Sequence, residues 1–240
     1  AVASGLSRAD IAEAAGILAA SKRGIFLWAM GLTHHTFGTD NILALSNLAL
    51  ARGWLGKPGA GLLPIRGHSN VQGVGSMGVA PELRSAFRER FETIYGIASK
   101  GRGFDTYESM SAAHDGRIKA ALLLGGNLFA SNPDRDWAAR SLRNIPMTFS
   151  MTTKLNEGHV HGRGKTAIVV PVLARDEEAQ ATTQESMFNF VRLSDGGVPA
   201  MPGEFRSEVE VLASLAERIL PPGRFDWRRL RSHAALREEI

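Results

Sequence analysis

Arginine, histidine and amide side chains alternate with glycines over residues 63–73 of this chain. Glycine lets the backbone come within hydrogen-bonding distance of a ligand. Asparagine and glutamine offer paired donor and acceptor edges that suit a heterocyclic base, and arginine offers a planar fork to a phosphate or carboxylate. The stretch therefore fits a large, polar, anionic heterocyclic ligand. The alternative is a packed glycine-rich turn with Arg66 in a surface salt bridge, because glycine-rich loops without a fixed pattern are weak evidence.

Further loops with small or amide side chains follow predicted strands at residues 31–38, 125–132 and 150–156. In parallel α/β sheets, ligands bind beyond the carboxyl ends of the strands, where loops and helix N-termini present unpaired N–H groups. The Gly-Gly-Asn sequence at 125–127 is therefore a candidate nucleotide cradle. A simple strand-to-helix turn explains the same sequence equally well.

Two histidine pairs, His34 with His35 and His159 with His161, raise the question of a zinc site. Neither pair has the i, i+4 spacing of a helical site or a clear carboxylate partner, so loop or core histidines are favoured and no metal site is predicted. The chain contains no cysteine, which excludes disulfides, a thiolate nucleophile and cysteine ligation of an iron–sulfur cluster. It also lacks G-x-S-x-G and G-x-x-x-x-G-K-[ST] sequences, which argues against a serine hydrolase and a P-loop phosphotransferase.

Local patterns predict the elements that must position these side chains. Ser7 with Asp10 forms a capping-box start, and apolar residues then repeat at helical spacing to about residue 21. Short apolar runs indicate strands at 25–30, 119–124, 146–151 and 167–172. Helices are expected at about 39–53, 81–95, 106–114, 134–143 and 204–220. The alternating order predicts an α/β fold with mostly parallel, Rossmann-like sheets flanked by helices.

The same patterns suggest three parts of the chain. Residues 1–66 would be the end of one α/β lobe, and residues 67–175 a second α/β lobe that carries the nucleotide-binding loops. Polar residues, glycines and prolines dominate 176–203, which predicts an extended surface excursion before a C-terminal helix within 176–240.

Composition indicates a folded protein, since 44% of the 240 residues are hydrophobic and 22% are charged. The net charge of +4 is weak evidence for a nucleic-acid partner, and none is expected, because a solvated terminal helix or tail explains the arginines clustered within 224–231. No apolar run approaches the ~20 residues that span a bilayer, and no secretory leader pattern is present. We therefore expect no membrane span, and the cytoplasm is the default location.

Taken in order along the chain, the motifs resemble those of the molybdopterin oxidoreductases. They are MGLTHH at 30–35, DN at 40–41, NLALARG at 47–53, GKPGAG at 56–61, RGHSNVQG at 66–73, MG at 77–78, GGN at 125–127, TKLN at 153–156 and VPVLAR at 170–175. Within that family the pattern is similar to the formate-dehydrogenase-like branch and to its YdeP-type members. The resemblance runs from about residue 7 to residue 220, and the ordered succession is far more specific than any single motif.

This resemblance implies a bis(molybdopterin guanine dinucleotide) cofactor that carries molybdenum. Arg66 matches the arginine that formate dehydrogenases place beside the metal, where it would hold a substrate carboxylate, and His68 stands where the family commonly has glutamine. The implied cofactor-binding residues in the first part of the chain are Gly31, Thr33, His34, His35, Gly67, Asn70, Gln72 and Gly73. Those implied along the guanine nucleotide are Gly125, Gly126, Asn127, Ser150, Thr152 and Lys154.

The chain also departs from the family pattern. Catalytic subunits of the family are several times longer, carry an N-terminal cysteine set for a 4Fe-4S cluster, and often ligate molybdenum through cysteine or selenocysteine. We therefore expect an internal or C-terminal piece of such a subunit, inactive by itself, whose remaining domains and electron-transfer partner complete the oxidation or reduction of a small anionic substrate. A non-catalytic nucleotide-binding or docking module on the same scaffold is the alternative, and a basic nucleic-acid binder ranks last.

Overall fold

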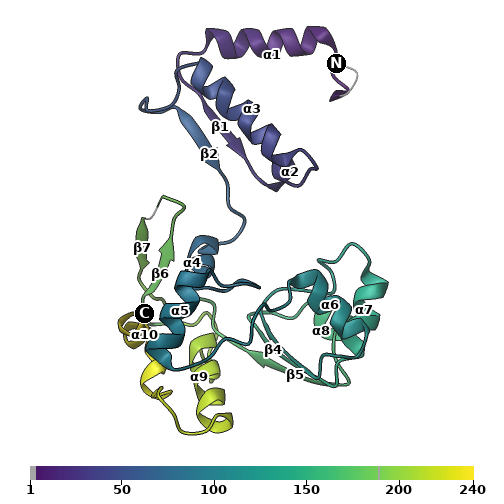
Figure 1. Cartoon of the computed structure of the whole chain (residues 1–240), viewed down its shortest axis with the longest axis vertical. Helices are drawn as coiled ribbons and strands as arrows, with labels where there is room; N and C mark the ends of the chain where they lie inside the picture. The colour runs from purple at the N-terminus through teal and green to yellow at the C-terminus, as the bar shows by residue number, and fades with distance from the viewer. Residues whose placement is uncertain (1–3, 189) are drawn as a thin grey trace. The chain divides into compact units, whose positions relative to one another are not determined.

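A computed structural model describes residues 4–188 and 190–240 of the chain. It consists of two compact units, one ending at Val71 and one beginning at Gln72. Both units contain parallel strands with helices packed against them, which confirms the predicted α/β fold class (Figure 1). In the described part of the chain, no helix combines the length and apolar character needed to cross a membrane.

The first unit is built around a short two-stranded parallel sheet. Its elements are α1 (Arg8–Ala20), β1 (Ile25–Trp28), α2 (Met30–Thr33), α3 (Gly38–Ala51) and β2 (Gly61–Pro64). The predicted capping box is present at the start of α1, where the Ser7 side chain accepts from the Asp10 N–H and the Asp10 side chain accepts from the Ser7 N–H. The strand β2 was not predicted, because its four residues lie between glycines and prolines that favoured a loop.

Trp54 forms the centre of this unit and is 2% exposed. Its ring lies 5.1 Å from the ring of Phe26 on β1. A Cβ added at Gly24 would come within 2.3 Å of the Trp54 ring, so only glycine fits where the chain enters β1. The indole thereby fixes the start of β1 against the segment that follows α3.

The second unit begins with three helices and then forms a parallel sheet. The helices are α4 (Val71–Ser76), α5 (Ser85–Tyr95) and α6 (Thr106–His114). The sheet has the order β3 (Ala120–Leu124), β4 (Met147–Thr152), β5 (Thr166–Pro171), with α7 (Arg135–Arg143) between β3 and β4 and α8 (Gly158–His161) between β4 and β5. In the register of this sheet, Leu122 pairs with Phe149 and Phe149 pairs with Ile168.

One face of this sheet carries the core of the second unit. Met110 and Ala113 of α6 pack with Ala138 and Leu142 of α7, and Ala121 of β3 packs against this cluster. Figure 1 shows α6 and α7 on the same side of the strands. The opposite face presents apolar side chains that are 41–50% exposed, namely Leu122, Leu124, Met147 and Ile168.

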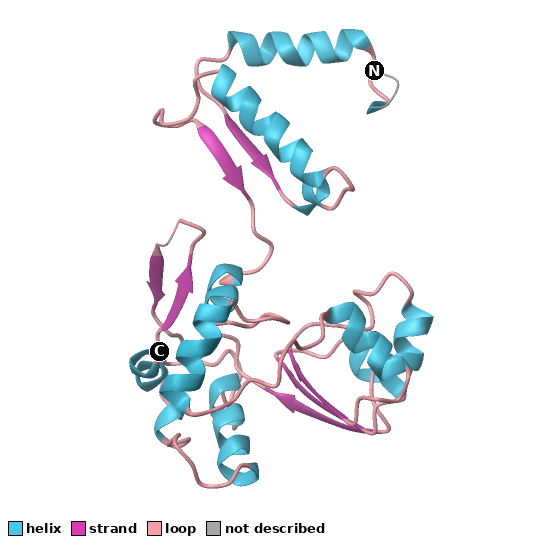
Figure 2. Cartoon of the chain, in the orientation of Figure 1, coloured by secondary structure: helices cyan, strands magenta, loops and turns pink. Residues whose placement is uncertain are grey.

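The segment predicted as an extended excursion contains an antiparallel hairpin, β6 (Thr182–Glu185) with β7 (Val191–Ser194) (Figure 2). Its strands are short and partly polar, so the sequence lacks the alternation that marks a half-buried hairpin. After it come α9 (Glu208–Ile219), a 3-10 turn (Arg229–Arg231) and α10 (His233–Glu239).

The C-terminal segment is packed against the unit instead of forming a solvated helix or tail. Leu230, His233 and Ala235 are buried. Arg228 and Arg231 both pair with Glu217 of α9, and Arg229 pairs with carboxylates of α10. Three of the four clustered arginines therefore have acidic partners within the chain, and Arg224 lies over the Tyr95 ring, which the linear sequence did not indicate.

Candidate functional site

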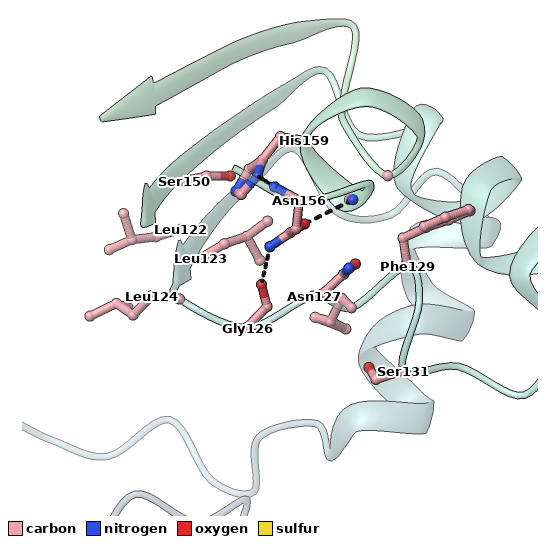
Figure 3. A pocket seen from close by; sticks show the side chains of 14 residues that line it. Leu122, Leu123, Leu124, Gly126, Asn127, Phe129, Ser131, Ser150, Asn156 and His159 are labelled. Atoms are coloured by element: carbon pink, nitrogen blue, oxygen red, sulfur yellow. Dashed lines mark hydrogen bonds between the residues drawn. The ribbon is translucent and has the colours of Figure 1, made fainter. Parts of the chain in front are cut away.

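A pocket of about 380 Å³ opens at the carboxyl ends of β3 and β4. Three segments line it: residues 122–129 with Ser131, Ser150 of β4, and four residues in and beside α8, namely Asn156, Gly158, His159 and Gly162. Figure 3 shows these segments converging on one hollow. The location matches the general rule that ligands of parallel α/β sheets bind beyond the carboxyl ends of the strands. We call it the β3–β4 pocket.

Two consecutive glycines turn the chain at the end of β3. Gly125 and Gly126 have φ values of 62° and 72°, in the left-handed region that favours glycine. The Gly125 N–H donates to the carbonyl oxygen of Met151 on β4 at 2.8 Å. This hydrogen bond holds the turn beside the end of β4, so the Gly-Gly sequence forms one edge of the pocket.

Asn156 connects that turn to the loop on the other side of the pocket. Its Nδ2 donates to the carbonyl oxygen of Gly126 at 3.2 Å, and its Oδ1 accepts from the Gly158 N–H at 2.9 Å (Figure 3). Asn127 folds its own segment, since its Oδ1 accepts from the Ala130 N–H at 3.0 Å. Two asparagine amides therefore hold the loops that form the pocket.

Gly158 lies where these two amides meet. A Cβ at this position would be 2.5 Å from Asn127 Oδ1 and 2.9 Å from Asn156 Oδ1, and both distances are shorter than real Cβ contacts. Gly162 is similarly confined, with its Cβ position 2.5 Å from the Cβ of Phe129. Both glycines are required by close approach and not by backbone conformation, because neither has a positive φ.

The pocket offers uncharged hydrogen-bonding groups and apolar surface. Among the described residues that line it, none is Lys, Arg, Asp or Glu. The Ser150 hydroxyl, the His159 ring and the two amides supply polar atoms, and leucines and Phe129 supply apolar contact. A few fixed polar groups on an apolar wall are typical of small-ligand sites, which have volumes of about 300–1,000 Å³. The size and donor set fit a nucleoside-sized part of a larger cofactor.

The structure brings together four of the residues predicted along a nucleotide. Gly125, Gly126, Asn127 and Ser150 all line the β3–β4 pocket. Thr152 and Lys154 follow at the end of β4 but are not among the lining residues: the Thr152 hydroxyl donates to the Lys154 carbonyl oxygen at 2.7 Å, and the Lys154 side chain is exposed.

The sequence patterns missed the residues beyond position 156 that complete the pocket. Gly158, His159 and Gly162 all line it. The available signal was an asparagine and a glycine separated by one residue in the loop that follows β4, and both residue types are typical of turns.

The remaining predicted residues lie elsewhere in the chain. Gly31 and Thr33 are in α2 and His34 and His35 follow it; all four are exposed, and His35 Nε2 lies 2.8 Å from the Gly31 carbonyl oxygen.

Arg66, Gly67 and His68 are exposed in the segment between β2 and α4. Asn70 adopts a left-handed φ of 63° just before α4. Gln72 and buried Gly73 lie within α4 and belong to the second unit.

Neither histidine pair forms a metal-binding cluster. Across residues 4–188 and 190–240, no group of three His, Asp or Glu side chains is arranged to hold a metal ion. The His161 ring lies 5.6 Å from the Phe129 ring, whereas the His159 Nδ1 accepts from the Asn156 N–H at 3.0 Å. The two rings of this pair therefore have different surroundings.

Comparisons with known proteins agree with this architecture. The molybdopterin oxidoreductase family profile matches residues 13–218. An uncharacterized oxidoreductase of Mycobacterium tuberculosis is 37% identical over 229 residues, which cover 92% of this chain and 29% of the relative. Protein YdeP of Escherichia coli is 36% identical over 231 residues, which cover 93% of this chain and 30% of YdeP.

A shorter match joins this chain to YrhE of Bacillus subtilis, which is provisionally named a formate dehydrogenase. The two are 37% identical over 133 residues, 52% of this chain and 14% of YrhE. The chain thus spans less than a third of the length of each of these relatives. The family profile covers most of the chain, and the resemblance seen in the sequence motifs is confirmed: this chain belongs to the molybdopterin oxidoreductase family.

Proposed function

We propose that this chain forms cofactor-holding lobes of a molybdenum-dependent oxidoreductase of the formate dehydrogenase type. In this proposal, the β3–β4 pocket binds one guanine nucleotide end of bis(molybdopterin guanine dinucleotide). The bound molybdenum centre would supply two-electron oxidation or reduction of a small anionic substrate. The remaining domains of the subunit would hold a 4Fe-4S cluster that passes the electrons to a partner.

The observation that carries the proposal is the β3–β4 pocket itself. Its position at the strand ends, its left-handed glycine pair and its amide-linked loops suit a heterocyclic base and its sugar. Backbone N–H groups at such turns approach a ligand closely because glycine has no side chain. Membership of the molybdopterin oxidoreductase family supports a pterin-type cofactor as the source of that nucleotide.

Arg66 and His68 are proposed to act on the substrate. The Arg66 guanidinium would hold the substrate anion and stabilise charge that develops during the reaction, and His68 would accept or return a proton. Both side chains are exposed in the first unit, as residues that meet a ligand need to be. In a site without water, an electrostatic contact of this kind lowers the activation free energy by about 2–4 kcal/mol, which corresponds to about 30- to 900-fold in rate.

The cofactor assignment is tested by analysing the protein purified from cells grown with molybdate. Acid hydrolysis should release GMP together with a pterin, and elemental analysis should find molybdenum. Asn156→Ala removes the link between the two pocket loops and should lower the GMP content. Asn47→Ala is the matched control, because Asn47 is exposed on α3, and it should retain wild-type GMP.

The result distinguishes the oxidoreductase from a non-catalytic nucleotide-binding module. GMP and molybdenum in constant ratio support the oxidoreductase. Binding of a guanine nucleotide without molybdenum supports the alternative, a non-catalytic nucleotide-binding or docking module. Release of CMP, or of no nucleotide, refutes the guanine assignment.

The role of Arg66 is tested separately in the full-length, cofactor-loaded subunit, because this chain alone is expected to be inactive. Arg66→Ala should lower turnover by about 30- to 900-fold while molybdenum and GMP contents stay at the wild-type level. Arg8→Ala removes an exposed arginine of α1 and should leave turnover unchanged. Unchanged turnover in Arg66→Ala contradicts the proposed role.

A further inference from the structure

His159 lines the β3–β4 pocket from α8, and its ring makes one hydrogen bond within the described part of the chain. Its Nδ1 accepts from the backbone N–H of Asn156 at 3.0 Å (Figure 3). A nitrogen that accepts an N–H cannot also carry a hydrogen, so in this arrangement the ring hydrogen is on Nε2. The backbone of the loop therefore selects the tautomer of the ring.

The Nε2–H of His159 has no acceptor among residues 4–188 and 190–240. The ring is only partly buried and lies on the wall of a pocket whose described lining contains no charged side chain. A ligand oxygen in this pocket would thus find no lysine or arginine on the wall. The oriented Nε2–H is therefore a fixed donor that the pocket wall offers to such an oxygen.

We propose that His159 donates a hydrogen bond from Nε2 to an oxygen of the guanine nucleotide in the β3–β4 pocket. This inference rests on the proposed function, because the nucleotide is the ligand proposed above. It assigns to His159 a role distinct from that of its neighbour His161, whose ring packs against Phe129. It also gives a reason for the short Asn156 loop, which holds the ring in one tautomer.

Two substitutions test the two ring nitrogens of His159 separately. In His159→Asn, the side-chain oxygen reaches the position of Nδ1 and keeps the acceptor for the Asn156 N–H, but nothing reaches the position of Nε2. In His159→Gln, the longer amide places an N–H near the position of Nε2 and gives up the internal bond. His161→Asn is the matched control on the same helix.

The experiment is a calorimetric titration of the cofactor-free protein with GDP. We expect His159→Asn to bind GDP about tenfold more weakly than the unsubstituted protein, as loss of one good hydrogen bond predicts. His159→Gln should stay within about threefold of it, and His161→Asn should be unchanged. Repeating the titration with guanosine locates the acceptor: a loss shared by both ligands places it on the nucleoside, and a loss with GDP alone places it on the diphosphate.

A second measurement does not depend on the nucleotide. Long-range proton–nitrogen spectra of the protein labelled with [15N]histidine should show Nδ1 of His159 without a hydrogen and Nε2 with one. The opposite tautomer overturns the inference. Equal GDP affinity of His159→Asn and the unsubstituted protein also overturns it but leaves the proposed function intact, whereas failure of the unsubstituted protein to bind GDP overturns both.

Discussion

Gly158→Ala should disrupt the β3–β4 pocket although it adds a single methyl group. The new Cβ would lie 2.5 Å from Asn127 Oδ1 and 2.9 Å from Asn156 Oδ1. Each oxygen already accepts a backbone N–H, from Ala130 and from Gly158 itself. Neither amide can move away without giving up a hydrogen bond that fixes a pocket loop.

The size of the effect follows from those two bonds. An internal hydrogen bond contributes about 0.5–1.5 kcal/mol net, so loss of both lowers the free energy of unfolding by about 1–3 kcal/mol. The Nδ2 of Asn156 would also leave the Gly126 carbonyl oxygen if the amide rotates. Because these contacts shape the proposed nucleotide site, GDP affinity should fall by at least about tenfold.

The measurement is urea unfolding followed by circular dichroism, together with a GDP titration. Gly75→Ala is the matched control: Gly75 lies in the short helix α4, has no positive φ, and its Cβ position has no neighbour within 4 Å. Alanine there should be neutral or stabilising by up to about 1 kcal/mol, because it is the better helix former. If the unfolding free energies of the two variants agree within about 0.5 kcal/mol, crowding at Gly158 does not support the pocket.

Three further perturbations test other parts of the structure. Asp134 caps α7 by accepting from the Trp137 N–H at 2.8 Å. Asp134→Ala should therefore lower the free energy of unfolding by about 1 kcal/mol, and Asp134→Asn should lower it little. Equal losses in the two variants would show that the cap contributes nothing. Gly125 has a φ of 62° and no neighbour within 4 Å of its Cβ position. In urea unfolding, Gly125→Ala should therefore lower the free energy of unfolding by about 1 kcal/mol, and Gly125→Asn should lower it less because asparagine tolerates this conformation. The reverse order would contradict backbone strain as the cause. Burial, with a smaller contribution from Glu178, raises the pKa of Glu208 above its ordinary value of 4.5, so the folded state binds the proton more tightly than the unfolded state. Unfolding free energy should therefore fall as pH rises from 4.5 through the raised pKa; Glu208→Gln should flatten that slope in pH-dependent melts, and an unchanged slope would refute the assignment.

Elements with local signals were predictable from the sequence. The Ser7 capping box marks the start of α1, and Asp134 marks the start of α7, because a cap acts within one turn. The apolar runs of β3, β4 and β5 were visible as strands, since side-chain type along five or six residues is enough to recognise them. The hairpin of β6 and β7 was not, because its stability depends on pairing between two short segments and not on either alone.

The site was predictable only in part, for a related reason. Residues 125–127 and Ser150 follow or end apolar strands, and the rule for parallel sheets places them at one edge. The need for glycine at position 158 depends on Asn127, 31 positions earlier, and only the folded chain brings the two together. His159 raised the question of a metal because histidine spacing was the visible pattern, whereas its hydrogen bond to the Asn156 backbone depends on loop geometry.

In the proposed function, the β3–β4 pocket would select its ligand by geometry more than by charge. Its described lining contains no charged side chain, so attraction over long distances contributes little at the pocket wall. The two amides already pair within the loops, whereas the His159 Nε2–H has no acceptor among the described residues, and a ligand that covers this donor without accepting from it loses about 1–3 kcal/mol. Selectivity between nucleotides would then depend on whether the base and sugar present an acceptor to this donor. In this proposal, the contacts that close the loops, from Asn156 to Gly126 and from Gly158 to Asn156, would therefore also determine which ligand fits.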